Sequence, residues 1–103
     1  MRFIKPSSLT EQSVILDIRS PEEYASETIG LPHIYLELDK LNPEEFVEQH
    51  QISTDETINI LCASGGRASI AAKMFEHSGF NNVAVIIGGI VEAEYEGVRV
   101  IKH

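Results

Sequence analysis

Residues 61–69 constrain this sequence more than any other segment, because they join a strand pattern to a helix pattern around the only cysteine. Residues 57–61 are apolar enough to predict a buried strand, and residues 67–78 carry small and apolar side chains at helical spacing. Between them a serine and two glycines allow a tight loop whose backbone N–H groups can converge. The sequence therefore predicts a strand–loop–helix unit with Cys62 at the rim of the loop.

Three features near Cys62 favour a thiolate over a neutral thiol. They are the convergent N–H groups, the positive end of a helix dipole and the guanidinium group of Arg67. A lone cysteine that ends an apolar strand is usually a small buried hydrophobe, and a Gly-Gly pair is usually a turn. The conjunction of strand, cysteine, glycine-rich loop, arginine and helix favours instead a nucleophile that handles sulfur.

Length and charge limit the classes of function. A chain of 103 residues is expected to form one domain, residues 1–103. With 8 basic and 16 acidic residues the net charge is −8, which argues against nucleic acid or an anionic membrane as a partner. No Cys/His cluster has the spacing of zinc ligands, so we expect neither a metal nor another cofactor. Without a signal peptide or a membrane-spanning stretch, the cytoplasm is the expected location.

Strand and helix patterns alternate along the whole chain. This alternation predicts an α/β fold with a mainly parallel central sheet, flanked by helices on both faces and connected by right-handed crossovers. The expected strands and extended segments are residues 3–4, 14–18, 34–38, 57–61, 83–87 and 98–101. The expected helical segments are residues 21–29, 43–49, 67–78 and 90–95, and residues 7–12 are expected to form a turn or a brief helix.

Two helices begin with strong sequence signals. Ser20 as N-cap, followed by a proline and then by Glu23, predicts a capping box. Asn42 and Glu45 repeat this pattern at the next helix. In parallel sheets the ligand site lies beyond the carboxyl ends of the strands. Cys62, the Arg19–Ser20 segment and the Gly88–Gly89 turn are all expected at that edge.

With these motifs in hand, the chain resembles a single-domain rhodanese, a thiosulfate or persulfide sulfurtransferase. The resemblance extends from Val14 to Ile101. It depends on the Asp17–Tyr24 segment, on the Cys62–Arg67 loop with its following helix, and on the strand that leads to Gly88–Ile90. The loop motif is the most specific of the three.

The resemblance implies an enzyme of the thiosulfate:cyanide sulfurtransferase type that works in two steps. The Cys62 thiolate would take the outer sulfur of a donor as a persulfide, and would then pass it to cyanide or a thiol. A sulfur-trafficking protein is a further possible partner. The loop implied to bind the substrate and stabilise the persulfide consists of Ala63, Ser64, Gly65, Gly66 and Arg67. Arg67 would orient an anionic donor, whereas Asp17 and Arg19 are expected to be structural.

Three positions depart from the family pattern. Glu27-Thr28-Ile29 replaces a common Gly-His-Ile. Ala93 stands where many members have tryptophan, and Tyr95 is expected to fill part of that space. Ala63 replaces a basic residue that attracts thiosulfate in some members, which weakens the case for thiosulfate as the donor.

Two alternatives remain. A cysteine phosphatase has five residues between its cysteine and arginine, whereas four separate Cys62 from Arg67 here, and no aspartate is placed as a general acid. A rhodanese-like binding or regulatory module, or a sulfur carrier with little turnover, is the stronger alternative. None of the four histidines is expected to act as a catalytic base.

Overall fold

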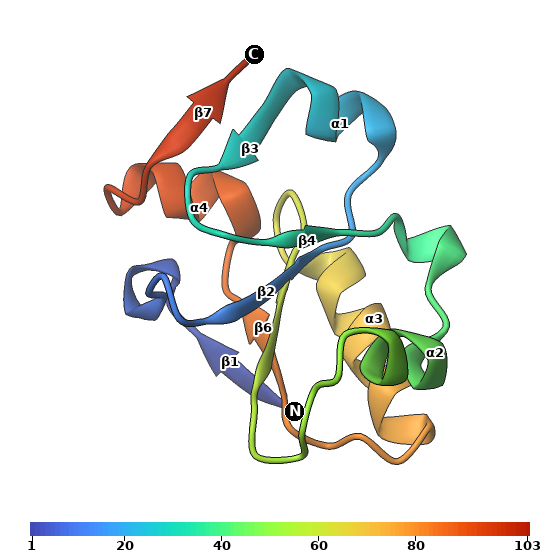
Figure 1. Cartoon of the computed structure of the whole chain (residues 1–103). Helices are drawn as coiled ribbons and strands as arrows, with labels where there is room; N and C mark the ends of the chain where they lie inside the picture. Colours follow the sequence, from blue (N-terminus) through green and yellow to red (C-terminus); the bar gives the residue numbers. More distant parts are fainter.

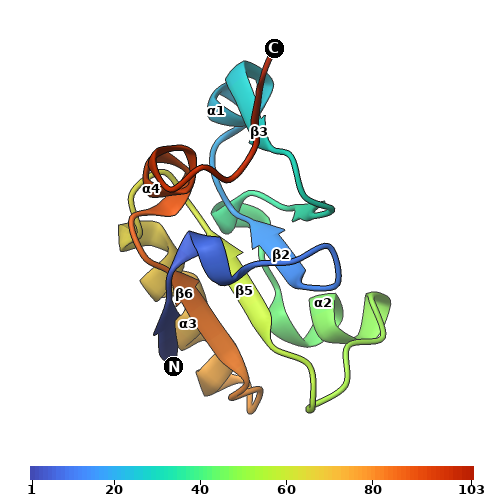
Figure 2. The same ribbon diagram turned by 90° about the vertical axis from the view of Figure 1, so that its left-hand side faces the viewer.

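Five parallel strands form the central sheet, in the order β1-β6-β5-β2-β4. The structure is a computed structural model that describes residues 1–103. The strands are β1 (Arg2–Ile4), β2 (Val14–Asp17), β4 (Ile34–Tyr35), β5 (Ile58–Leu61) and β6 (Val83–Ile86). Figure 2 shows β6, β5 and β2 side by side. The predicted parallel sheet is confirmed, with the strand that leads to Cys62 at its centre.

Helices cover both faces of this sheet, as predicted (Figure 1). One face packs against α2 (Pro43–Gln49) and α3 (Gly66–His77). The other face is covered by the 3-10 turn η1 (Pro6–Ser8) and by α4 (Gly89–Tyr95). The remaining helix, α1 (Pro21–Ser26), follows β2. None of these helices has the length and apolar character needed to cross a membrane.

The alternation of side chains along each strand divides the core between the two faces. Leu16, Ile60 and Val85 point toward α2 and α3, and Ile15 and Leu61 point the other way. The predicted apolar stripe of α3 is completely buried, and it consists of Ala68, Ala71, Ala72 and Phe75. The small alanines let α3 lie close to the sheet, which fixes the position of its first turn beside Cys62.

The two predicted helix starts differ in the structure. At α1 the capping box is complete, because the Glu23 N–H donates to Ser20 Oγ and the Ser20 N–H donates to Glu23 Oε1. At α2 the Glu45 N–H donates to Asn42 Oδ1 at 3.2 Å, but the Glu45 side chain does not return the contact. The reciprocal half of the second box was therefore predicted wrongly.

A two-stranded antiparallel sheet was not predicted. It pairs β3 (Glu27–Ile29) with β7 (Val100–Lys102). Helix α1 consequently ends at Ser26, and residues 27–29, which were expected to continue it, form a strand. The strand expected over residues 34–38 is also shorter, because after the two residues of β4 the chain enters a 3-10 turn, η2 (Leu38–Lys40).

The expectation for Tyr95 is wrong. The side chain is 86% exposed and fills no interior space. Helix α4 buries Gly89, Ile90 and Ala93. Because each helical residue turns by about 100°, a side chain two positions beyond Ala93 points to the opposite side of the helix.

Candidate active site

Cys62 directly follows β5, and the loop after it leads to Gly66, the first residue of α3. Gly65, at the N-cap of α3, has φ 110°, in the left-handed region that favours glycine. This turn directs the Gly65 N–H toward the cysteine, to which it donates with an N–Sγ distance of 2.8 Å. Cys62 is only 1% exposed, so it lies inside the loop. The expected position at the rim of the loop is therefore wrong.

A second backbone segment supports the start of this loop. The Ile90 N–H donates to the carbonyl oxygen of Cys62 at 2.9 Å, and the Val91 N–H donates to that of Ala63 at 3.4 Å. Gly89, with φ 60°, permits this approach, because a Cβ there would overlap the carbonyl oxygen of Cys62. The Gly88–Gly89 turn therefore lies at the same sheet edge as Cys62, as predicted, and is in direct backbone contact with the loop.

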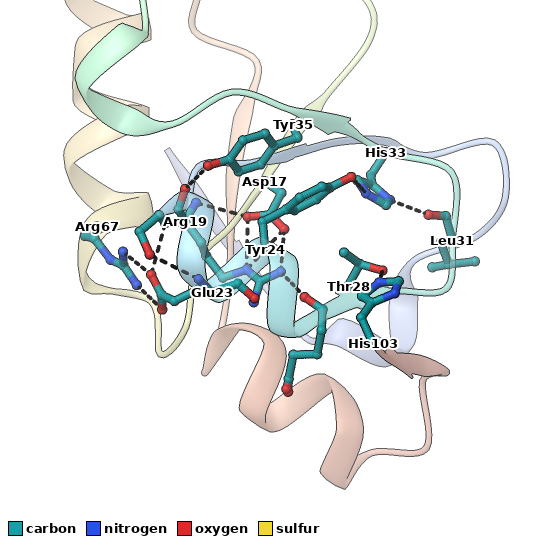
Figure 3. Close-up of polar contacts among 12 residues, drawn as sticks. Asp17, Arg19, Glu23, Tyr24, Thr28, Leu31, His33, Tyr35, Arg67 and His103 are labelled. Atoms are coloured by element: carbon teal, nitrogen blue, oxygen red, sulfur yellow. Dashed lines mark hydrogen bonds and ion pairs between the residues drawn. The ribbon is translucent and has the colours of Figure 1, made fainter.

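Arg67 has a partner that the sequence did not reveal. Its Nη1 and Nη2 donate to the two carboxylate oxygens of Glu23 at 2.7 and 2.8 Å (Figure 3). The side chains are 38% and 33% exposed, respectively, so the pair lies at the surface. The residues are 44 positions apart, and no local pattern marks this pairing. In the sequence, Glu23 is recognisable only as a member of the capping box.

The ion pair shifts the titration of both partners. Hydrogen bonds from Arg67 hold the pKa of Glu23 at about 2, against an ordinary value of 4.5. Conversely, the pKa of Arg67 is raised, chiefly by its hydrogen bonds to Glu23 and to a smaller degree by the nearby Cys62. Both Arg67 and Glu23 are therefore charged at neutral pH.

This low pKa predicts an acid-dependent contribution to stability. The ion pair stabilises the fold fully above about pH 4.5, and the contribution is lost as the pH falls toward about 2. We expect the difference in unfolding free energy between the wild type and Glu23→Gln to shrink across this interval. Because the pair is partly exposed, the effect should be modest and should weaken in salt.

Urea denaturation at a series of pH values would measure this difference. Glu22→Gln is the matched control, since Glu22 lies in the same helical turn and makes no ion pair. A difference between the wild type and Glu23→Gln that stays constant from pH 6 to pH 2 would contradict the assignment.

Asp17 and Arg19 form a second, fully buried ion pair near the carboxyl end of β2. The Arg19 Nε and Nη2 donate to the Asp17 carboxylate at 2.9–3.1 Å, and Nη2 also donates to the carbonyl oxygen of Glu27 at 2.7 Å. The Arg19 side chain is 2% exposed and the Asp17 side chain is 0% exposed. As expected, these residues are structural: they connect the end of β2 to the end of α1 and to β3.

Two of the histidines bind neighbouring side chains (Figure 3). His33 bonds to the carbonyl oxygen of Leu31 through Nδ1 and to the hydroxyl of Tyr24 through Nε2, each at 2.8 Å. Because a carbonyl oxygen can only accept, Nδ1 carries the proton and the Tyr24 hydroxyl donates to Nε2. The His103 ring bonds to the hydroxyl of Thr28 at 2.9 Å. No histidine makes a hydrogen bond to Cys62.

The site is closed around the sulfur atom. None of the surface hollows of the molecule is lined by a residue of the 62–67 loop. No three His, Cys, Asp or Glu side chains come together in a way that could hold a metal ion.

A backbone N–H directed at a sulfur atom stabilises negative charge on it. This arrangement is chemically suited to holding one anionic sulfur.

Comparisons with known proteins agree with this description. The model of the rhodanese-like domain family matches residues 7–95. A tRNA sulfurtransferase of Tolumonas auensis is 32% identical over 82 residues, a match that takes in 77% of this chain but only 16% of the relative. The chain thus corresponds to a small part of that protein.

Solved structures share the fold. A rhodanese-related protein of Thermoplasma volcanium superposes with a TM-score of 0.75 at 25% identity, over 98% of each chain. A rhodanese-like domain protein of Staphylococcus aureus gives a TM-score of 0.71 at 23% identity, over 100% of each chain.

Proposed function

This chain belongs to the rhodanese-like domain family, a sulfurtransferase-type family, and we propose that it moves a sulfane sulfur through a persulfide on Cys62. The donor would be thiosulfate or a persulfide, and the acceptor cyanide, a small thiol or a sulfur-trafficking protein. The observation that carries the proposal is the hydrogen bond from the Gly65 N–H to Cys62 Sγ, 2.8 Å long. It places a donor where a thiolate, and later the sulfur bound to it, requires stabilisation.

In the first step the Cys62 thiolate attacks the outer sulfur of the donor. A new S–S bond forms on Cys62, the S–S bond of the donor breaks, and sulfite or a thiolate leaves with the bonding electrons. In the second step the acceptor attacks the outer sulfur of the Cys62 persulfide. The S–S bond of the persulfide breaks, and Cys62 is released as a thiolate. No general base is needed once the thiolate has formed.

The loop backbone supplies the electrostatic part of this mechanism. Ala63, Ser64, Gly65 and Gly66 lead into α3, whose first turn carries Arg67. In the proposal, their N–H groups stabilise the terminal sulfur of the persulfide, as an oxyanion hole stabilises oxygen. The hydrogen bonds from α4 to the carbonyl oxygens of Cys62 and Ala63 help keep the loop in this conformation.

Intact-mass measurement tests the proposal directly. We expect the protein to gain one sulfur atom after incubation with thiosulfate or glutathione persulfide, and to lose it on addition of cyanide or dithiothreitol. Cys62→Ala and Cys62→Ser should gain none, because Cys62 is the only cysteine. Circular dichroism would verify that both variants are folded. A wild type that gains no sulfur from either donor would refute the proposal.

One observation favours a second candidate, a rhodanese-like binding module or sulfur carrier with little turnover. Cys62 is 1% exposed, so a donor or acceptor must displace part of its surroundings to reach the sulfur. Stable loading of Cys62, together with transfer to small thiols at the background rate, would favour this alternative.

A further inference from the structure

The charge of Arg67 is already balanced by Glu23. Both terminal nitrogens of the guanidinium group are bound to the two oxygens of one carboxylate (Figure 3). A bidentate pair of this kind is among the stronger charge-assisted contacts in proteins. An anionic donor that approaches Arg67 must therefore compete with a carboxylate that is already in place.

Glu23 is held in position independently of Arg67. The same oxygen that binds Arg67 Nη1 also accepts the Ser20 N–H at 3.0 Å, and the Glu23 N–H donates to Ser20 Oγ at 3.2 Å. The helix start thus fixes the carboxylate in front of Arg67. With a pKa of about 2, the carboxylate is ionised at every physiological pH.

No second cation forms an ion pair with the Glu23 carboxylate. Arg19 is buried against Asp17, and Lys102 lies between Glu27 and Glu94. Position 63 is alanine, and the whole chain carries a charge of −8. Once Cys62 is a thiolate, the group formed by Arg67, Glu23 and Cys62 has a net negative charge, so a second anion is repelled in proportion to its charge.

We propose that Glu23 is a specificity-determining residue that neutralises Arg67 and so directs the site toward thiol persulfides and away from the thiosulfate dianion. This inference rests on the proposed function, and it assigns the class of donor. In the favoured step, the Cys62 thiolate attacks the outer sulfur of R–S–SH. The S–S bond of the donor breaks, the Cys62–S–SH persulfide forms with the proton retained, and R–S⁻ leaves with the bonding electrons.

Glu23→Gln is a suitable test because glutamine preserves the capping box, in which its side-chain oxygen can still accept the Ser20 N–H. Glu22→Gln is the matched control: it removes the same charge from the same helical turn, at an exposed residue without an ion pair to Arg67.

Alkylation of Cys62 tests the electrostatics without any sulfur transfer. The measured quantity is the rate constant for anionic iodoacetate divided by that for neutral iodoacetamide. Both reagents depend on the same movement to reach the sulfur, so the contribution of this movement cancels in the ratio. The labelling is unambiguous because Cys62 is the only cysteine. We expect Glu23→Gln to raise this ratio about tenfold, as removal of a unit charge close to the reaction should. Glu22→Gln should change the ratio less than twofold. Equal ratios in the wild type and Glu23→Gln would overturn the inference.

Donor kinetics then test its consequence for specificity. Glu23→Gln should increase kcat/KM for thiosulfate about tenfold relative to that for the persulfide of 2-mercaptoethanol, a donor without carboxylates, mainly through a lower KM for thiosulfate. If both donors change equally, the inference fails and the proposed function stands. If neither donor loads Cys62 in any variant, the proposed function fails as well, whatever the alkylation ratios show.

Discussion

Replacing Arg19 with alanine should lower the free energy of unfolding by about 3–5 kcal/mol, the usual cost of leaving one member of a buried ion pair alone. Asp17 would be left without its partner at 0% exposure. It would lose every side-chain donor that it has in the structure and retain only the Arg19 N–H. The carbonyl oxygens of Glu23 and Glu27 would also lose their Arg19 donors. Urea denaturation followed by circular dichroism measures this loss.

The double variant Asp17→Asn, Arg19→Met separates charge from packing. It removes both charges and keeps a long side chain in the space of Arg19, so it should be more stable than Arg19→Ala. If Arg19→Ala costs less than about 1 kcal/mol, the pair is not the junction between β2, α1 and β3 that its hydrogen bonds indicate.

The second large effect is expected at Gly89. In Gly89→Ala the new Cβ would overlap the carbonyl oxygen of Cys62 and would lie 2.5 Å from that of Ala63. The start of α4 must then move away, which breaks the hydrogen bonds from Ile90 and Val91 to the loop. We expect the rate of persulfide formation on Cys62 to fall about 100-fold, the size of effect that a displacement of about 1 Å can have. Single-turnover mass measurements would follow this rate.

Gly97→Ala is the matched control for this substitution. Gly97 also has a positive φ, 88°, but a Cβ there would meet nothing within 4 Å. Both variants therefore carry backbone strain, and only Gly89→Ala disturbs the loop. Equal rates of persulfide formation in the two variants would show that the contact between α4 and the loop does not support the reaction.

Local signals made most of the fold predictable. Val83, Val85 and Ile86 lie in a continuous apolar run, which is typical of a central parallel strand. The α3 stripe follows from helical periodicity, and the α1 start follows from Ser20 and Glu23. Each of these signals involves residues a few positions apart, at distances where backbone geometry alone determines which side chains meet.

The features that were missed depend on residues far apart in the sequence. Strands β3 and β7 have three residues each, too few for a recognisable alternation, and they meet only because the C-terminal segment returns to residues 27–29. The contact between Arg67 and Glu23 is of the same kind. The segment that carries the sulfur is therefore recognisable in the sequence, whereas the carboxylate that determines the charge beside it is not.

The position of β5 in the sheet has a consequence for how the molecule fluctuates. Both of its edges are bonded to neighbours of four residues, β2 and β6, whereas the outer strands β1 and β4 have three and two residues. Local fraying begins where few bonds must break, so it starts at the outer strands and reaches the centre only on complete unfolding. Cys62 is attached to β5, the last strand to open, so thermal motion of the outer strands β1 and β4 leaves its support in place.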